Sequence, residues 1–323
     1  MIQIARGIII LFFLSFFLSC NAPHDNLLDP VNTKYPFVSI EGTVQTFSVP
    51  YAGIAGVTVY WQSGNILVTT DSSGKYLINR IKPVNGKLIY SKEGYRADTV
   101  EIIWHRAKKI SRNVNLNKIP KLDSISIYTV VINQYYPSQT ANLFINAKIS
   151  DSDNDISNVF IVNNGLNLNR ALNFNVTSKI YQIELSTADL HIIDIEETIG
   201  LNFNIVVKDI FSRLFNVGSE KVTRVIKKGV IIRGPANDTT ISPLPDLQWQ
   251  RYTPGYPFSY MIEIYTNDFA NSQLIESKAG ISPDSISYQV QNPLPAGDYY
   301  WVIWVIDKFK NRVRSLPATF RVK

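Results

Sequence analysis

Few residues of this sequence have the types and spacing that support catalysis. The three histidines, His24, His105 and His191, are far apart in the chain. A metal centre or catalytic dyad built on them would therefore need contacts between separate segments. No Gly-x-Ser-x-Gly nucleophile elbow, phosphate-binding loop or dinucleotide-binding fingerprint occurs. Paired carboxylates could still meet in space, but the sequence predicts a protein that is not an enzyme.

One acidic segment has the residue types that bind a metal ion. Asp151, Asp153 and Asp155 alternate along the chain, and carboxylates at this spacing resemble the start of an EF-hand calcium loop. The sixth position is Ile156 rather than glycine, and the twelfth is Val162 rather than glutamate. Two interpretations stay open: a turn whose Asp and Asn side chains bind their own backbone, or such a turn with a weak structural Ca²⁺ site. No other cofactor is expected.

A basic row could bind an anionic ligand. Lys308, Lys310, Arg312 and Arg314 follow one another at a spacing of two, so on a strand they would share one face. That face could dock an anionic glycan or a lipid headgroup. The alternative, which we favour, is that the row protects an edge strand against aggregation.

An aromatic loop is the second candidate binding surface. Residues 251–258 include Tyr252, Tyr256 and Phe258 together with two prolines. If Tyr252 and Tyr256 are exposed, their rings could stack on sugar rings or on a partner peptide. The favoured alternative is that the rings fold down as a lid over the core.

Composition places these residues in packed globular modules. The chain has 323 residues, 45% hydrophobic and 12% aromatic, and a net charge of +6. This length suits two or three domains, and the charge excess is too small to indicate a nucleic-acid partner. Because Cys20 is the only cysteine, no disulfide can form within the chain, and each domain must be held by its own apolar core.

The N-terminus predicts export and lipid attachment. Arg6 precedes an apolar run over residues 8–18, which is shorter than the roughly 20 residues of a membrane span and is typical of a signal peptide. The run ends in Phe17-Leu18-Ser19-Cys20, which resembles the lipobox of bacterial lipoproteins, with Phe17 where an aliphatic residue is common. The resemblance implies cleavage before Cys20 and acylation of that cysteine. Asn21, in place of an aspartate, favours the outer membrane by the same analogy.

Beyond a polar, proline-containing tether over residues 20–36, short alternating strands dominate. In residues 37–118 one expected strand places the side chains of Val57, Val59 and Trp61 on the same face. Residues 69–76 form a tight turn between two strands. The order of Gly42-x-Val44, Gly56-Val57-x-Val59, Thr70-Asp71-x-x-Gly74-x-Tyr76 and Lys92-Glu93-Gly94-Tyr95 resembles the carboxypeptidase regulatory-like domain. The resemblance implies a small transthyretin-like β-sandwich, a hairpin at residues 70–76 and no catalytic activity.

Residues 119–228 and 229–323 are also predicted to consist mainly of strands. In residues 119–228 the expected strands are 124–132, 141–149, 159–162, 181–185, 201–207 and 222–225, with one helical turn within 187–198. In residues 229–323 they are 247–249, 260–265, 287–290, 299–306 and 318–322.

An internal echo links these two blocks. The alternating apolar run from Leu201 to Asp209 recurs from Tyr299 to Asp307 at a constant offset of 98 residues. In both copies the aspartate is expected to open an Asx-type turn, and the offset equals one immunoglobulin-sized sandwich. Residues 229–323 also resemble fibronectin type III-like modules of bacterial surface proteins. That resemblance rests on Leu247-x-Trp249, Leu294-x-Ala296-Gly297-x-Tyr299-x-Trp301 and Asp307.

The sequence thus predicts an all-β protein of three tandem β-sandwich domains after a lipoprotein signal peptide (1–19) and a short tether (20–36). The domains are a carboxypeptidase regulatory-like sandwich (37–118), an Ig-like sandwich (119–228) and a fibronectin type III-like sandwich (229–323). The expected function is a non-catalytic cell-envelope lipoprotein that displays these modules for binding or as a spacer. The alternative is a glycan-binding accessory of a polysaccharide uptake or degradation system. Expected partners are the membrane, through the lipid, and a protein or polysaccharide.

Overall fold

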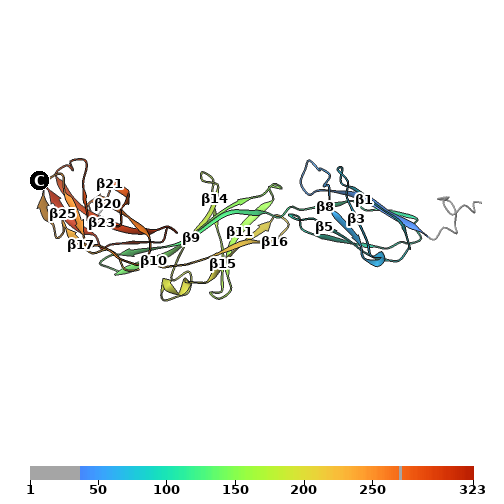
Figure 1. Ribbon diagram of the computed structural model, residues 1–323, viewed down its shortest axis with the longest axis horizontal. Coiled ribbons are helices and arrows are strands. Elements are labelled where there is room, and N and C mark those ends of the chain that lie inside the picture. The colour runs from blue at the N-terminus through green and yellow to red at the C-terminus, as the bar shows by residue number, and fades with distance from the viewer. Residues whose placement is uncertain (1–36, 269–270) are drawn as a thin grey trace, which may run out of the picture. The chain divides into compact units, whose positions relative to one another are not determined.

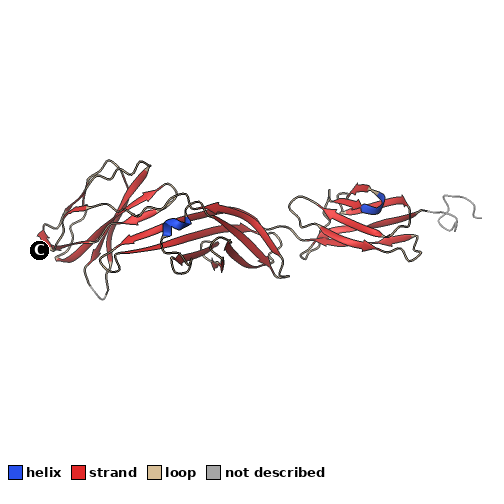
Figure 2. Ribbon diagram, turned by 90° about the horizontal axis from the view of Figure 1, so that it is seen from below, coloured by secondary structure: helices blue, strands red, loops and turns tan. Residues whose placement is uncertain are grey.

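The regular structure is almost entirely β-strand (Figures 1 and 2). The computed structural model describes residues 37–268 and 271–323, so the predicted signal peptide, Cys20 and the predicted tether lie outside the described residues. The helices in the described part are two 3₁₀ turns, η1 (Gln62–Gly64) and η2 (Ile195–Thr198). In that part no helix is both long and apolar enough to cross a membrane. The all-β prediction is confirmed.

The chain divides into two compact units between Lys118 and Ile119. The first unit is a sandwich of two four-stranded sheets. One sheet consists of β4 (Lys75–Ile81), β1 (Val38–Thr46), β7 (Lys109–Ser111) and β8 (Val114–Leu116). The other consists of β3 (Ile66–Thr69), β2 (Thr58–Trp61), β5 (Gly86–Ser91) and β6 (Asp98–Ile102). Val57, Val59 and Trp61 are all buried in its core, as their alternation predicts.

The turn at residues 70–76 differs from the expected hairpin. β3 pairs with β2, whereas β4 pairs with β1, so the turn carries the chain from one sheet to the other. The Asp71 carboxylate holds the turn by accepting hydrogen bonds from the backbone N–H groups of Ser73 and Lys75, at 2.8 and 2.9 Å. Those two hydrogen bonds and one from the Ser73 hydroxyl lower the pKa of Asp71. The local turn chemistry was predictable, but the pairing partners were not.

The second unit contains three sheets. The longest consists of β13 (Asn173–Asn175), β14 (Ile180–Ser186), β10 (Gln139–Ser150), β9 (Lys121–Asn133), β24 (Arg312–Arg314), β23 (Gly297–Asp307), β20 (Phe258–Thr266) and β21 (Leu274–Ile281), with β25 (Ala318–Val322) on β23 and β18 (Thr239–Ile241) on β25. The second consists of β12 (Leu168–Ala171), β11 (Ile156–Asn163), β15 (Asn202–Asp209) and β16 (Leu214–Lys221). The third consists of β17 (Ile232–Gly234), β19 (Asp246–Trp249) and β22 (Ser287–Gln289).

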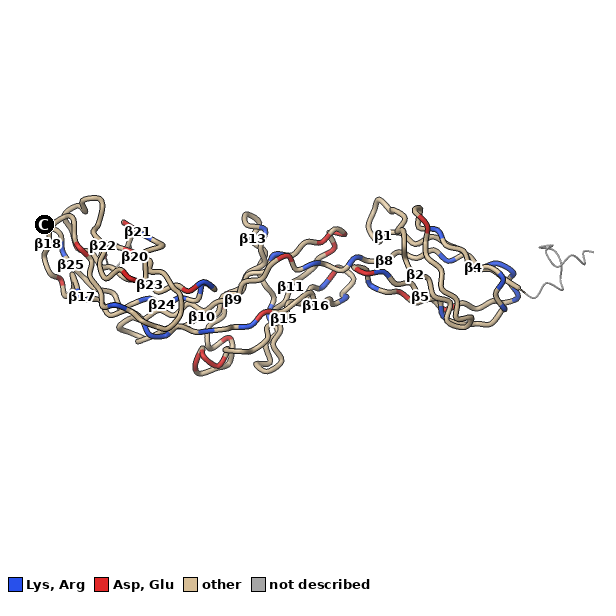
Figure 3. Tube along the Cα trace, in the orientation of Figure 1, with Lys and Arg blue, Asp and Glu red and all other residues tan. Residues whose placement is uncertain are grey.

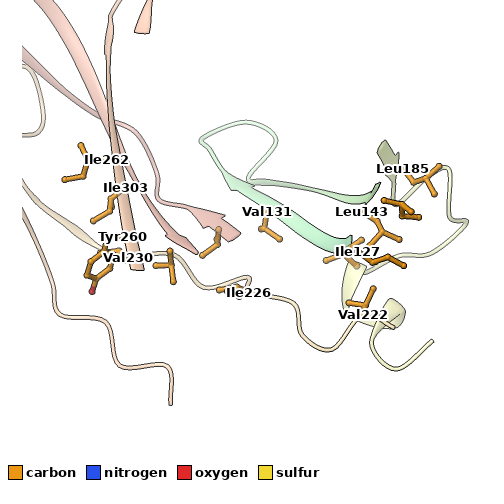
Figure 4. Close-up of a cluster of buried hydrophobic side chains, with 14 of the residues drawn as sticks. Ile127, Val131, Leu143, Leu185, Val222, Ile226, Val230, Tyr260, Ile262 and Ile303 are labelled. Carbon is orange, nitrogen blue, oxygen red and sulfur yellow. The ribbon is translucent and has the colours of Figure 1, made fainter. Parts of the chain in front are cut away.

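The longest sheet crosses from residues 119–228 into residues 229–323. β24 runs parallel to β9, with Val313 opposite Val131. One hydrophobic core also continues through both segments, and Figure 4 shows Val131, Ile226 and Val230 bridging its two ends. Hydrogen-bonded sheet and buried apolar surface therefore join the second and third sandwiches into one body.

The internal echo has the same structure in both copies. β15 ends at Asp209 and β23 at Asp307. The Asp209 carboxylate accepts from the backbone N–H groups of Phe211 and Arg213, and that of Asp307 accepts from Phe309 and Asn311. The predicted Asx-type turn is confirmed in both places.

Some expected elements differ. Residues 222–225 form no strand. The strand that precedes them, β16, was not predicted, and it pairs with β15. The helical turn within 187–198 is the short η2, capped by the Asp194 carboxylate and by Glu197.

Candidate functional site

A buried polar network joins the second and third sandwiches. The buried Asn311 side chain accepts a hydrogen bond from the backbone N–H of Thr129 at 2.9 Å. Its amide donates to Asp307 at 3.1 Å, and Asp307 also accepts from Arg224 Nη1 at 3.2 Å. The side chain of Asp307 is fully buried. These groups connect β9, the β23–β24 turn and the segment after β16 that carries Arg224. Of them, only Asp307 was singled out from the sequence, as the residue that opens a turn.

The aromatic loop packs against this junction. Tyr252 and Tyr256 are both partly buried against the core, and the Arg224 guanidinium lies over the Tyr256 ring at 4.0 Å. Burial, together with the Tyr252 hydroxyl 3.5 Å away, raises the pKa of Tyr256. The observed packing is that of a lid over the core. Ligand binding by these two rings stays a prediction.

The basic row is not a single strand face. Lys308 and Lys310 lie in the turn after β23, and only Arg312 and Arg314 are on β24. The edge-strand interpretation is wrong, because β24 pairs with β23 on one side and with β9 on the other. Arg312 lies over the Trp304 ring, 5.1 Å from its centroid. Figure 3 shows both signs of charge distributed along both units.

The three aspartates lie in the loop between β10 and β11. The Asp151 carboxylate accepts from the backbone N–H groups of Asp153 and Asp155, at 3.2 and 2.9 Å. Asp155 is buried, and its carboxylate lies 3.8 Å from Arg213 Nη2. Within residues 37–268 and 271–323 no three His, Cys, Asp or Glu side chains are grouped in a way that could hold a metal ion. The calcium site stays a prediction, and the turn interpretation accounts for the contacts of Asp151.

A separate aromatic cluster covers the outer face of the longest sheet. Val302 and Trp304 are buried there, while their neighbours Trp301 and Ile303 point into the sandwich core, because successive side chains of a strand alternate between faces. Cross-strand ring pairs surround them, Tyr128 with Phe144 at 5.4 Å and Tyr265 with Tyr300 at 5.1 Å, both nearly parallel. In each pair the two rings stack face to face.

The carboxylate of Glu263 is the polar centre of this outer cluster. It accepts from the Tyr265 hydroxyl at 2.9 Å and from Trp304 Nε1 at 2.7 Å. Burial, and secondarily the hydrogen bond to Glu263, raise the pKa of Tyr265 to about 12. In the third sandwich, burial and Glu276 likewise raise the pKa of Tyr288 to about 12.

These shifts predict a loss of stability in alkali. A tyrosine in the unfolded chain ionises near pH 10, whereas Tyr265 and Tyr288 in the folded protein stay neutral up to about pH 12. Ionisation therefore favours the unfolded state, and the urea midpoint of residues 119–323 should fall as pH rises from about 10 to 12. Tyr265→Phe and Tyr288→Phe should each reduce that fall, and a midpoint that is constant over this range would contradict the assignment.

Neither a protein-family model nor a curated protein sequence matches the chain. Fibronectin(III)-like modules of Clostridium thermocellum CbhA are 13% identical, with 63% of this chain and 93% of that chain covered and a TM-score of 0.27. The FN1–FN3 domains of chicken CNTN1 are 9% identical, with coverages of 84% and 93% and a TM-score of 0.33. A 1.5-MDa bacterial ice-binding adhesin is 10% identical, with coverages of 88% and 91% and a TM-score of 0.25. No functional conclusion follows from similarity at this level.

Proposed function

We propose that this chain is a non-catalytic lipoprotein of the bacterial cell envelope that displays β-sandwich modules as a binding or spacer element. The observation that carries the proposal is the joining of the second and third sandwiches by β9 and β24. A spacer module must hold the loops at its two ends at a fixed distance from each other. A shared sheet and a shared core meet that requirement better than a flexible linker would.

The attachment part of the proposal rests on the sequence around Cys20. A single acyl chain gives only marginal membrane binding, whereas two or more give lasting attachment, and the lipobox resemblance implies several chains on Cys20. The proposed location is the outer membrane, on the basis of Asn21. Cys20 has no second cysteine in the chain with which to form a disulfide. Its thiol is therefore available for acylation.

A glycan-binding accessory lipoprotein is the alternative function. From the sequence it depends on Tyr252 and Tyr256. Both rings pack against the core, and Tyr256 also packs against Arg224. Only part of each ring is therefore open to a sugar. A pocket elsewhere in the second unit supports the alternative.

Cys20→Ala should move the protein from the detergent phase to the aqueous phase of a Triton X-114 extraction of producing cells. Acylation of the wild type should also be visible as incorporation of labelled palmitate, and the variant should incorporate none. Ser15→Ala, which changes the apolar run but keeps the cysteine, is the matched control and should partition like the wild type. The anchoring proposal is refuted if the wild type is found in the aqueous phase without label.

A further inference from the structure

A pocket lies where the β9–β10 loop of the second sandwich approaches the third. Its volume is about 640 Å³, within the range of small-molecule sites. Its wall comes from three segments of the second unit that are distant in sequence, over residues 133–138, 229–237 and 315–319. All three segments belong to the body joined by β9 and β24.

The polar groups of the wall are of two kinds. Some hold the junction together: the Asn133 amide donates to the Arg314 carbonyl at 2.8 Å, and the Ser315 hydroxyl accepts from the Ile303 N–H at 3.0 Å. By contrast, the side chains of Gln134, Arg233 and Asn237 make no hydrogen bond or ion pair with the described part of the chain. Two amides and one guanidinium are thus available to a ligand, and together they offer mainly donors.

Tyr135 adds a fixed aromatic surface. Its hydroxyl donates to the Pro317 carbonyl at 3.1 Å, which ties the β9–β10 loop to the third sandwich. The side chain nevertheless is 74% exposed, so the ring is held in place while much of its surface stays open. Ile231 and Leu316 contribute further exposed apolar surface to the same wall. A ring with polar groups around it suits a sugar, whose faces are apolar and whose rim carries hydroxyls.

The charge of the lining residues indicates which class of sugar the pocket would bind. Arg233 is the only charged side chain among the lining residues, and no aspartate or glutamate lines the pocket. Asp238, the nearest acid in the sequence, is outside the lining and interacts electrostatically with Arg321. A planar guanidinium with five donors matches a carboxylate in a bidentate pair.

We propose that this pocket binds an acidic saccharide. Arg233 pairs with the carboxylate of the sugar, the Tyr135 ring stacks on a pyranose face, and Gln134 and Asn237 bind hydroxyl groups. The proposal goes beyond anchoring and spacing and does not require the lipid. It gives the glycan-binding alternative a site other than Tyr252 and Tyr256.

The test is calorimetric titration of the detergent-solubilised full chain with tetragalacturonate, a hyaluronan tetrasaccharide and an alginate tetrasaccharide, with cellotetraose as the neutral probe. At least one acidic probe should bind, and cellotetraose should bind at least about tenfold more weakly. Arg233→Gln and Tyr135→Ala should each weaken that binding by about tenfold or more, the typical loss for a charged hydrogen bond or an aromatic contact.

Two neighbours outside the pocket serve as controls. Tyr136 is 94% exposed and Lys228 is also exposed, but neither lines the pocket, so Tyr136→Ala and Lys228→Gln should change affinity by less than about twofold. Circular dichroism verifies that each variant is folded. Failure of all three acidic probes to bind overturns the proposal, and so does binding that survives both Arg233→Gln and Tyr135→Ala. Either failure leaves the detergent partition of the wild type unchanged, so the anchoring proposal is judged separately.

Discussion

Asp307→Ala should destabilise residues 119–323 by about 3–4 kcal/mol. The Asp307 side chain is fully buried and accepts from the backbone N–H groups of Phe309 and Asn311, from the Asn311 amide and from Arg224. Alanine leaves these donors without their acceptor. Arg224 is partly exposed and can turn to water, so most of the loss should come from the buried donors of the turn.

Urea unfolding followed by tryptophan fluorescence measures this change, and Asp298→Ala is the matched control. Asp298 also carries an ion pair, with Arg321, but both side chains are about half exposed, and exposed pairs contribute little to stability. The control should therefore unfold almost like the wild type. Equal urea midpoints for the two variants would mean that the buried turn contributes no more than a surface pair.

The same variant tests whether the second and third sandwiches unfold together. Asn311 connects Asp307 to Thr129 on β9, and β24 pairs directly with β9. Amide hydrogen exchange should therefore speed up in β9 (Lys121–Asn133) as well as in β23 and β24, because a cooperative unit loses protection as a whole. Loss of protection confined to residues 229–323 would show that the two sandwiches are independent, and the spacer proposal would lose its main support.

Period-two alternation explains which strands could be predicted. Val57, Val59 and Trp61 and the run ending at Asp209 bury every second residue, and this information is local in the sequence. The echoed run ending at Asp307 has the same apolar alternation on its core face, but Val302 and Trp304 between those residues are buried as well, on the outer face of the sheet. β21 was not predicted because seven of its eight residues are not buried, so no apolar alternation marks it. β16 was missed because its second half is Gly218-Ser219-Glu220-Lys221, which reads as a turn.

Pairing between distant strands could not be predicted. β24 is three residues long and β9 lies about 180 positions earlier in the chain, so no local pattern records that they meet. The prediction of a hairpin at residues 70–76 was wrong for the same reason, because a tight turn with the residues of a hairpin can also connect two sheets. Turn chemistry is set by adjacent residues, whereas the choice of partner is set by the packing of the whole unit.

The same distinction between local pattern and packing applies to the candidate sites. The sequence marks Tyr252 and Tyr256 as candidate binding residues because their loop is rich in aromatic residues. Whether a ring can bind a ligand depends on its exposure, and exposure depends on what packs against the ring. The pocket residues Tyr135 and Arg233 are nearly 100 positions apart and belong to no motif. The one available signal was Tyr135-Tyr136-Pro137, an aromatic pair in a turn between two predicted strands.

Gly74→Ala should destabilise the first unit by about 3 kcal/mol or more. Gly74 has φ of +78°, where an alanine costs about 1–2 kcal/mol through its Cβ. A Cβ at this position would also overlap the Val44 carbonyl oxygen and lie 2.8 Å from Gly53 Cα. Both obstacles are backbone atoms, so no side-chain rotation can relieve the overlap.

Gly94→Ala separates the two contributions. Gly94 has the same φ of +78°, but a Cβ there would meet nothing within 4 Å, so this variant should show only the conformational cost. The difference in urea midpoint between the two variants thus measures the close approach at Gly74. That approach is structural: the Gly74 carbonyl accepts from the Val44 N–H at 2.8 Å, and the Val44 carbonyl accepts from the Ile54 N–H at 2.9 Å. A Cβ that displaces the Val44 carbonyl must disturb both hydrogen bonds. Equal midpoints for Gly74→Ala and Gly94→Ala would mean that the crossing turn yields without cost and does not hold the first sandwich closed.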